Sequence, residues 1–109
     1  MADFDAFASL DIRVGRVVDV KDFPQARKPA YRLWIDFGPM GVKTSSAQIT
    51  AYYHPEDLLG RQVVAVTNFP PRQIATFLSQ VLVLGVYDQA GGVVLLKPDR
   101  EVSLGDRIG

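Results

Sequence analysis

The sequence predicts an all-β fold, a small five-stranded barrel with a short N-terminal helix and a second short helix between the third and fourth strands. Two observations carry this prediction. Short runs alternate between apolar and polar residues with the period of two that marks a half-buried strand. Glycines and prolines punctuate these runs as turn residues do. The chain of 109 residues suits one core and is too short for two.

The N-terminal segment 3–10 is expected to form the first helix. Its apolar residues Phe4, Phe7 and Leu10 recur at helical spacing. A helix this short is not stable alone, so it must dock on the domain or on a partner subunit.

The strands and the second helix follow in order. Gly15 interrupts the first strand early, which is typical of a bend where a sheet curls onto itself. A proline after His54, acids in the next two positions and Gly60 predict the second helix. Five strands are expected over 11–23, 31–37, 42–49, 63–69 and 81–87, after which the glycine pair 91–92 turns the chain into 93–96. A polar tail over 98–108 has Val102, Leu104 and Ile108 as its apolar contacts.

This order of elements suits a five-stranded oligonucleotide/oligosaccharide-binding (OB) barrel. An SH3-like barrel or a small sandwich would share much of the pattern. The predicted organisation is an N-terminal segment 1–10, a barrel domain 11–97 and a C-terminal tail 98–109.

Composition excludes several classes of function. The net charge is zero, unlike that of a nonspecific nucleic-acid coater. Without cysteine the chain has no disulfide, thiolate metal site or thiol nucleophile. The first ten residues lack the basic and apolar regions of a secretion signal, and no apolar run approaches the length of a membrane span. A cytoplasmic protein without membrane insertion is expected.

Catalysis finds little support. The single histidine, His54, stands directly before Pro55, where a role at the helix start explains it. Neither a GxxxxGK[ST] loop nor a GxGxxG loop occurs. No enzyme activity, catalytic residue, metal or cofactor is expected.

Binding features are concentrated in the middle of the chain. Residues 24–54 contain one acid, Asp36, against four cations, namely Arg27, Lys28, Arg32 and Lys43. The polar run 43–48 offers donors and acceptors to a ligand. A solvated loop and a strand end whose side chains satisfy the backbone are equally good explanations of these two features.

A third feature combines aromatic residues with prolines. The segment 68–73 includes Phe69, two prolines and Arg72, and prolines restrict a loop so that less ordering is needed on binding. If Phe37, Phe69 and Phe77 were exposed together, they would form an apolar patch for unfolded polypeptide or for stacked bases. Aromatic residues are more often core, so interior packing is the alternative.

The segments 11–17 (DIRVGRV) and 60–66 (GRQVVAV), with Asn68 and Pro70, resemble the bacterial tRNA-binding domain family. The segments 26–31 (ARKPAY), 43–50 (KTSSAQIT) and 68–75 (NFPPRQIA) are similar to its CsaA-type, export-related chaperone subgroup. Many tRNA-binding relatives carry Ser, an acid or amide, Gly and Met at the entry to the fifth strand. Here Ser79 and Gln80 are followed by Val81 and Leu82, which agrees with the CsaA-type pattern and argues against carrying the tRNA activity over.

The resemblance implies an OB-fold homodimer that binds unfolded preproteins for export without ATP, with the Sec export motor as a candidate partner. It also implies a dimer interface formed by the terminal segments, which we assign to Phe4, Phe7, Leu104 and Ile108.

Two functions follow, both on one face of the barrel. The first is a chaperone whose expected peptide-binding residues are Phe37, Lys43, Ser45, Ser46, Gln48, Asn68, Phe69, Pro70, Arg72, Phe77 and Ser79. The alternative is tRNA binding, in which Arg27, Lys28, Lys43 and Arg72 meet phosphates and aromatic residues stack on bases.

Overall fold

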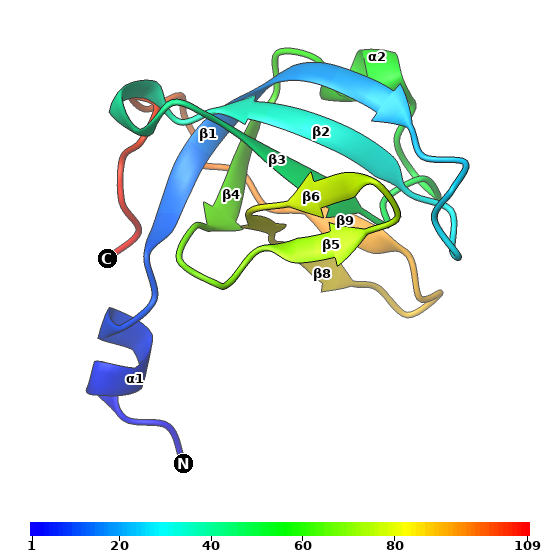
Figure 1. Ribbon diagram of the computed structural model, residues 1–109. Helices are drawn as coiled ribbons and strands as arrows, with labels where there is room; N and C mark the ends of the chain where they lie inside the picture. Colours follow the sequence, from blue (N-terminus) through cyan, green and yellow to red (C-terminus); the bar gives the residue numbers. More distant parts are fainter.

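The computed structural model describes residues 1–109 and consists of short helices and strands built around a barrel (Figure 1). The elements are α1 (Phe4–Ala8), β1 (Ile12–Asp22), β2 (Tyr31–Asp36), the 3-10 helix η1 (Gly38–Met40), β3 (Val42–Ala47), α2 (Pro55–Leu58), β4 (Gln62–Val66), β5 (Arg72–Ile74), β6 (Phe77–Ser79), β7 (Leu82–Val83), β8 (Gly85–Tyr87) and β9 (Val93–Leu95).

Five strands form one antiparallel sheet in the order β3-β2-β1-β4-β7. The segment that enters β7 returns to the free edge of β3, where the Gln80 N–H donates to the Thr44 carbonyl at 2.8 Å. The sheet is therefore the nearly closed five-stranded barrel that the sequence predicts. Both predicted helices are present.

Gly15 lies where β1 changes partner, next to Arg16, which pairs with both β4 and β2. A Cβ atom at Gly15 would lie 2.5 Å from Ile35 Cγ2 and 2.8 Å from Phe37 Cε1. The irregularity in register comes later, between Val17 and Asp19. The glycine thus permits the close approach of β1 to the barrel interior.

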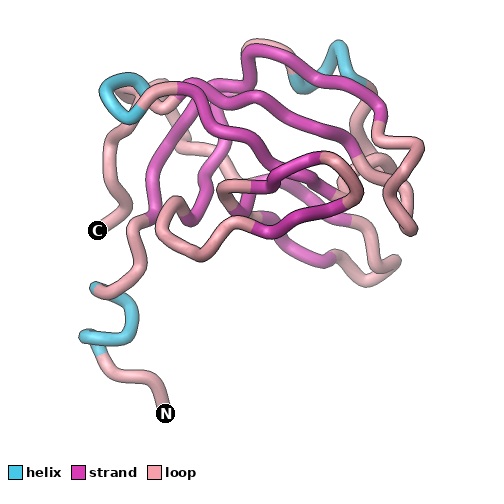
Figure 2. Tube along the Cα trace, in the orientation of Figure 1, coloured by secondary structure: helices cyan, strands magenta, loops and turns pink.

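The two helices differ in how they are held. At α2, the Asp57 carboxylate accepts the backbone N–H of His54 at 2.9 Å, so this histidine begins a helix. At α1, the Asp3 carboxylate accepts the Ala6 N–H at 2.9 Å, but none of the helix residues is buried. Figures 1 and 2 show α1 projecting from the barrel.

Two segments differ from the sequence prediction. The expected strand 81–87 is divided at Leu84, because the chain there passes from pairing with β4 to pairing with β9. The β5–β6 hairpin was not predicted. Its turn passes through Ala75 at φ 51°, a left-handed conformation usually taken by glycine, so the sequence carried no turn residue to mark it.

The apolar residues form two clusters. The larger fills the barrel, and the smaller lies outside it on β1 and β4 around Ile12 and Val64. Val102 and Ile108 of the C-terminal tail cover the smaller cluster, and the Gln62 side chain fastens the tail by bonds to the Val102 backbone at 2.8 and 3.2 Å. None of the helices has the length and apolar character to traverse a bilayer.

Candidate functional site

Phe37 lies in the core, so its assignment to an exposed patch is wrong. Its side chain is 0% exposed and belongs to the cluster that fills the barrel. The inward residues of β2 alternate from Tyr31 to Ile35, and Phe37 continues the same parity. This alternation was visible in the sequence and places the ring inside.

Ser45 is also internal, with 1% of its surface exposed. It lies directly opposite Leu33 on β2, and cross-strand partners project to the same side of a sheet. A client chain cannot reach this hydroxyl, so Ser45 is withdrawn as a binding residue. Its neighbour Ser46 lies opposite Arg32 and is half-buried.

Phe77 is half-buried in an aromatic cluster on the outer face of β2. Its ring lies edge-on to Phe23 and Trp34, with centroids 5.5 and 5.8 Å apart. Lys21 and Arg32 cover this cluster, at 5.3 Å from the Trp34 centroid and 5.5 Å from the Phe23 centroid. The cluster anchors the β5–β6 hairpin to the barrel, whereas Phe69 stays 43% exposed.

Asn68 and Ser79 use their polar groups inside the chain. The Asn68 side chain accepts the Asp11 N–H and donates to the Ser9 carbonyl, both at 2.9 Å. The Ser79 hydroxyl accepts the Ser46 N–H at 3.0 Å. These bonds fix the N-terminal segment and the hairpin, so both side chains have a structural role within the chain.

A hollow of ≈ 470 Å³ opens where β3 diverges from β7 and β8. Its size falls at the lower end of ligand pockets. Ser46, Gln48 and Arg72 of the predicted site line it. Its other walls are apolar and were not predicted, including Ile49, Leu82, Val83, Leu84, Tyr87 and Val93.

Hydrogen bonds to Asp88 hold the turn between β8 and β9 at the far end of this hollow. The Tyr52 hydroxyl donates to the Asp88 carboxylate, which also accepts the backbone N–H groups of Ala90 and Gly92. The Tyr52 bond is the main cause that lowers the pKa of Asp88 and raises the pKa of Tyr52. The glycine pair in this turn was the sequence signal for a hairpin at this position.

The predicted basic residues do not form one patch. The loop that carries Arg27 and Lys28 leads into Tyr31 at the start of β2. Lys43 pairs instead with Ile35, which lies four residues further along β2 than Tyr31. At about 3.3 Å per residue this separates the two basic sites by about 13 Å along the sheet. Lys43 is also half-buried, since it projects to the same side of the sheet as its core partner.

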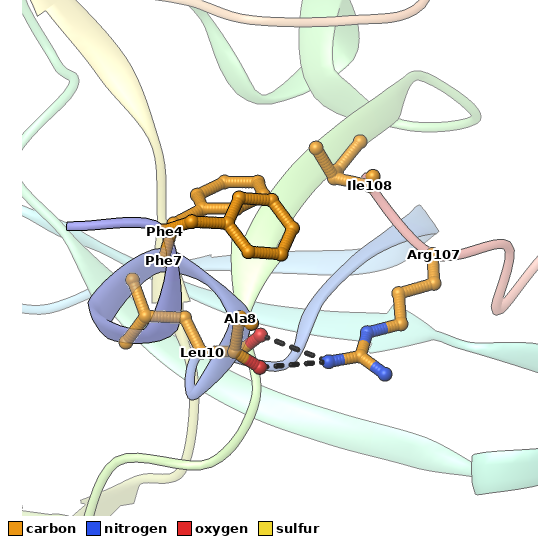
Figure 3. A pocket seen from close by; sticks show the side chains of 7 residues that line it. Phe4, Phe7, Ala8, Leu10, Arg107 and Ile108 are labelled. Carbon is orange, nitrogen blue, oxygen red and sulfur yellow. Dashed lines mark hydrogen bonds between the residues drawn. The ribbon is translucent and has the colours of Figure 1, made fainter.

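The terminal segments meet in a second hollow of ≈ 310 Å³, drawn in Figure 3. Phe4, Phe7 and Ile108 of the predicted interface line it. The Arg107 guanidinium crosses from the tail to the helix and donates to the carbonyls of Ala8 and Leu10 at 3.2 and 3.3 Å.

Leu104 lies elsewhere. It is half-buried against Gly38 of η1, where a Cβ on the glycine would meet the Leu104 backbone. It does not line the hollow that the other three predicted interface residues share.

Asp11 ties these terminal segments to the barrel. The Thr67 hydroxyl donates to its carboxylate at 2.7 Å, and Arg13 and Arg107 lie 3.0 and 3.5 Å from it. The Thr67 hydrogen bond, followed by the charges of Arg13 and Arg107, lowers the pKa of Asp11 although partial burial opposes the shift. The ionised carboxylate is therefore the form that the fold stabilises.

An aliphatic face extends from the terminal segments across β8 and β9. Val86 and Val94 are paired and project to the same side, with 53% and 43% of their surfaces exposed. Leu82 and Leu96 are exposed beside them, and Leu84 joins this face to the smaller cluster on β1 and β4. No element of the chain covers it.

Comparisons with known proteins identify the family. Residues 12–107 match the putative tRNA binding domain family. Over 105 residues the chain is 44% identical to the methionine–tRNA ligase of Pyrococcus abyssi, covering 96% of this chain and 14% of that enzyme. The chain thus spans about a seventh of the curated enzymes it matches.

Solved structures of chaperones match over the whole chain. The CsaA chaperone of Bacillus anthracis is 55% identical at a TM-score of 0.95, covering 100% of this chain and 99% of that one. The CsaA chaperone of Picrophilus torridus is 49% identical at the same TM-score and covers both chains fully. These matches confirm the OB-type barrel, and the chain belongs to the putative tRNA-binding domain family as a CsaA-type member.

Proposed function

We propose that the chain is a molecular chaperone that works without ATP and binds unfolded polypeptide in the hollow between β3 and β7–β8. The observation that carries the proposal is the composition of this hollow. Apolar residues form most of its walls, while Ser46, Gln48 and Arg72 supply polar groups at its edge. An extended chain without fixed sequence needs this combination of apolar contact and backbone hydrogen bonding.

The full-length similarity to CsaA chaperones supports this function. The resemblance of the sequence further implies clients that are preproteins awaiting export, met in the cytoplasm, with the Sec motor as a candidate partner. Apolar burial gives about 25 cal/mol per Å², and ordering the client offsets much of it, so dissociation constants are expected in the micromolar range.

The proposed working form is a homodimer. Two surfaces that a stable monomer would cover are open here, namely the α1 helix with Phe4 and Phe7 and the aliphatic face of β8–β9. Exposed apolar faces of this kind mark protein contacts. A second copy would bury both surfaces, since Leu10, Leu84 and Ile108 pack on one cluster that links them.

Binding of tRNA is the second candidate, favoured by the family match and by the similarity to methionine–tRNA ligases. Four phosphate contacts, from Arg27, Lys28, Lys43 and Arg72, would make affinity strongly salt-dependent. The logarithm of the binding constant falls by about 0.7 to 0.9 per contact for each tenfold rise in salt, so such a rise would weaken binding at least several hundredfold. The separation of the basic sites counts against this candidate.

One experiment separates the two functions. Labelled tRNA and a labelled, permanently unfolded polypeptide are titrated with the protein at about 50 mM and about 500 mM salt. Chaperone function predicts micromolar polypeptide binding that changes little with salt. The double variant Arg27→Gln, Lys28→Gln should leave it unchanged, because neither residue lines the hollow. Tight, salt-sensitive tRNA binding without polypeptide binding would reverse the assignment.

A further inference from the structure

The hollow between β3 and β7–β8 is bounded by strand edges rather than by one face of a sheet. Its walls include the consecutive residues 46–49 on one side and 82–85 on the other. Side chains on one face of a strand would contribute only every second residue. The hollow therefore follows two backbones, and the hydrogen-bonding state of those backbones decides what it can hold.

One edge belongs to the segment 82–88. Leu84 donates its N–H to the Val64 carbonyl at 2.8 Å and accepts the Leu96 N–H at 3.3 Å. Alternate residues of a strand direct their backbone groups to the same edge, so the even-numbered residues serve β4 and β9. The odd-numbered residues direct theirs to the opposite edge, toward the hollow.

The other edge belongs to β3 and its continuation. Thr44 is occupied by Gln80, and the Ser46 N–H by Ser79. Gln48, next on this edge, has no hydrogen-bond partner within the chain for its backbone N–H or carbonyl. The edge is free from the point where β3 and β7 separate.

Two free edges that face each other across a hollow can each pair with an added strand. We infer that an extended client segment enters the hollow as an added strand and bonds through its backbone to Gln48 on one side and to Val83, Gly85 and Tyr87 on the other. This inference rests on the proposed function and specifies how the client is held. Backbone bonding explains how clients of unrelated sequence could share one site.

The surroundings also favour a particular client chemistry. One side of the added strand would lie over Ile49, Val83 and Val93, which suits small aliphatic side chains at alternate positions. Arg72 pairs with Ser79, which bonds to Ser46, so its guanidinium stands at the Ser46 end. Arg72 takes part in none of the ion pairs of the structure. The segment bound best is therefore an alternating aliphatic and polar one with an acidic residue at this end.

Amide hydrogen exchange tests the inference with the full-length protein. The probe is a nine-residue peptide of alternating valine and threonine with one glutamate near an end. On saturation, exchange of the Gln48, Val83, Gly85 and Tyr87 amides should slow at least about tenfold, and that of exposed Gln25 and Lys28 should not change. Peptide binding without this protection overturns the added strand and leaves the chaperone proposal standing. No binding of peptide or unfolded polypeptide overturns both.

Modified peptides give an independent readout. N-methylation of a peptide removes backbone N–H donors. One peptide is methylated at its odd positions and a second at its even positions, so that each loses the donors that face one of the two edges. Either set of methyl groups should weaken binding about fivefold per lost hydrogen bond. If neither methylated peptide binds more weakly, the client is held by side chains alone and the inference is wrong. If only one of them binds more weakly, the client does not use the second edge, which contradicts pairing with both.

Charge exchange locates the acidic end. Arg72→Glu should weaken binding of the glutamate peptide. It should restore affinity when lysine replaces glutamate in that peptide. Equal losses for both peptides would show that Arg72 does not meet the client's charge. Thermal unfolding of the variant separates this loss from misfolding, because Arg72 is exposed and unpaired.

Discussion

The side-chain carbonyl of Gln80 lies 3.0 Å from the Thr44 backbone nitrogen and accepts its hydrogen, while the Gln80 N–H donates to the Thr44 carbonyl at 2.8 Å. A side chain thus takes the place of a missing backbone acceptor where the barrel closes. Ser79 does the same for Ser46. Ser79 and Gln80, the two residues that agree with the family's pattern at the entry to the fifth predicted strand, therefore hold the barrel closed, and the hollow begins immediately beyond them.

Removing this closure should destabilise the fold. Gln80→Ala leaves the half-buried Thr44 N–H unpaired, so the free energy of unfolding should fall by about 1–3 kcal/mol. Gln25→Ala, in an exposed loop, should change it by less than about 0.5 kcal/mol. Urea denaturation measures both. Equal stability of the two variants would mean that Gln80 does not hold the barrel closed.

Phe37 should behave as a core residue. Phe37→Ala should lower the free energy of unfolding by about 3–5 kcal/mol, because it removes a fully buried ring from the barrel. Phe69→Ala, at an exposed position, should cost much less. Chemical denaturation compares the two. A stable Phe37→Ala variant that lost only polypeptide binding would return Phe37 to the binding surface.

Asp11 should make stability depend on pH in the acid range. Folding lowers its pKa, so the ionised carboxylate contributes stability that is fully present above the unfolded-state pKa, near about 4. This contribution is lost as the pH falls through the lower, folded-state pKa. Asp11→Asn should cost about 1–3 kcal/mol at neutral pH and progressively less toward about pH 2.

Unfolding curves measured across this pH range test the assignment, with Asp99→Asn as control because that carboxylate makes no hydrogen bond or ion pair in the structure. If the free energies of unfolding of wild type and Asp11→Asn differ by the same amount at every pH, the charge of Asp11 does not contribute to stability.

The proposed dimer should depend on the two uncovered apolar surfaces. Phe4→Glu with Phe7→Glu, or Val86→Glu with Val94→Glu, should give monomers in analytical ultracentrifugation, since buried unpaired charge opposes association. Leu59→Glu, at an exposed leucine beside α2, should remain dimeric. A dimer that survives both double substitutions would place the interface elsewhere.

Much of the fold could be predicted because local pattern and tertiary contact agree. Alternation in 31–37 and the proline and acids after His54 gave β2 and α2 close to their observed bounds. The β5–β6 hairpin could not be predicted, since its turn at Ala75 lacks the glycine that usually accepts a positive φ.

The site was predicted less well because exposure depends on which strands meet. Phe37 was assigned to the surface although its parity with Leu33 and Ile35 placed it inside. The unpaired edge at Gln48 could not be foreseen, because it arises where two strands distant in sequence diverge. Polarity in the run 43–48 located one wall of the hollow, but nothing in the apolar run 81–87 marked the other.

Site-specific crosslinking tests the central claim most directly. The chain has no cysteine, so a photoactivatable group can be attached through a single Gln48→Cys substitution at an exposed position in the hollow. The matched control is Leu59→Cys beside α2, which lies on the other side of the barrel from β8 in Figure 1. If clients bind in the hollow, unfolded polypeptide should crosslink to position 48 and not to position 59. Crosslinking at 59 alone, or at neither site while the polypeptide is bound, would contradict binding in the hollow.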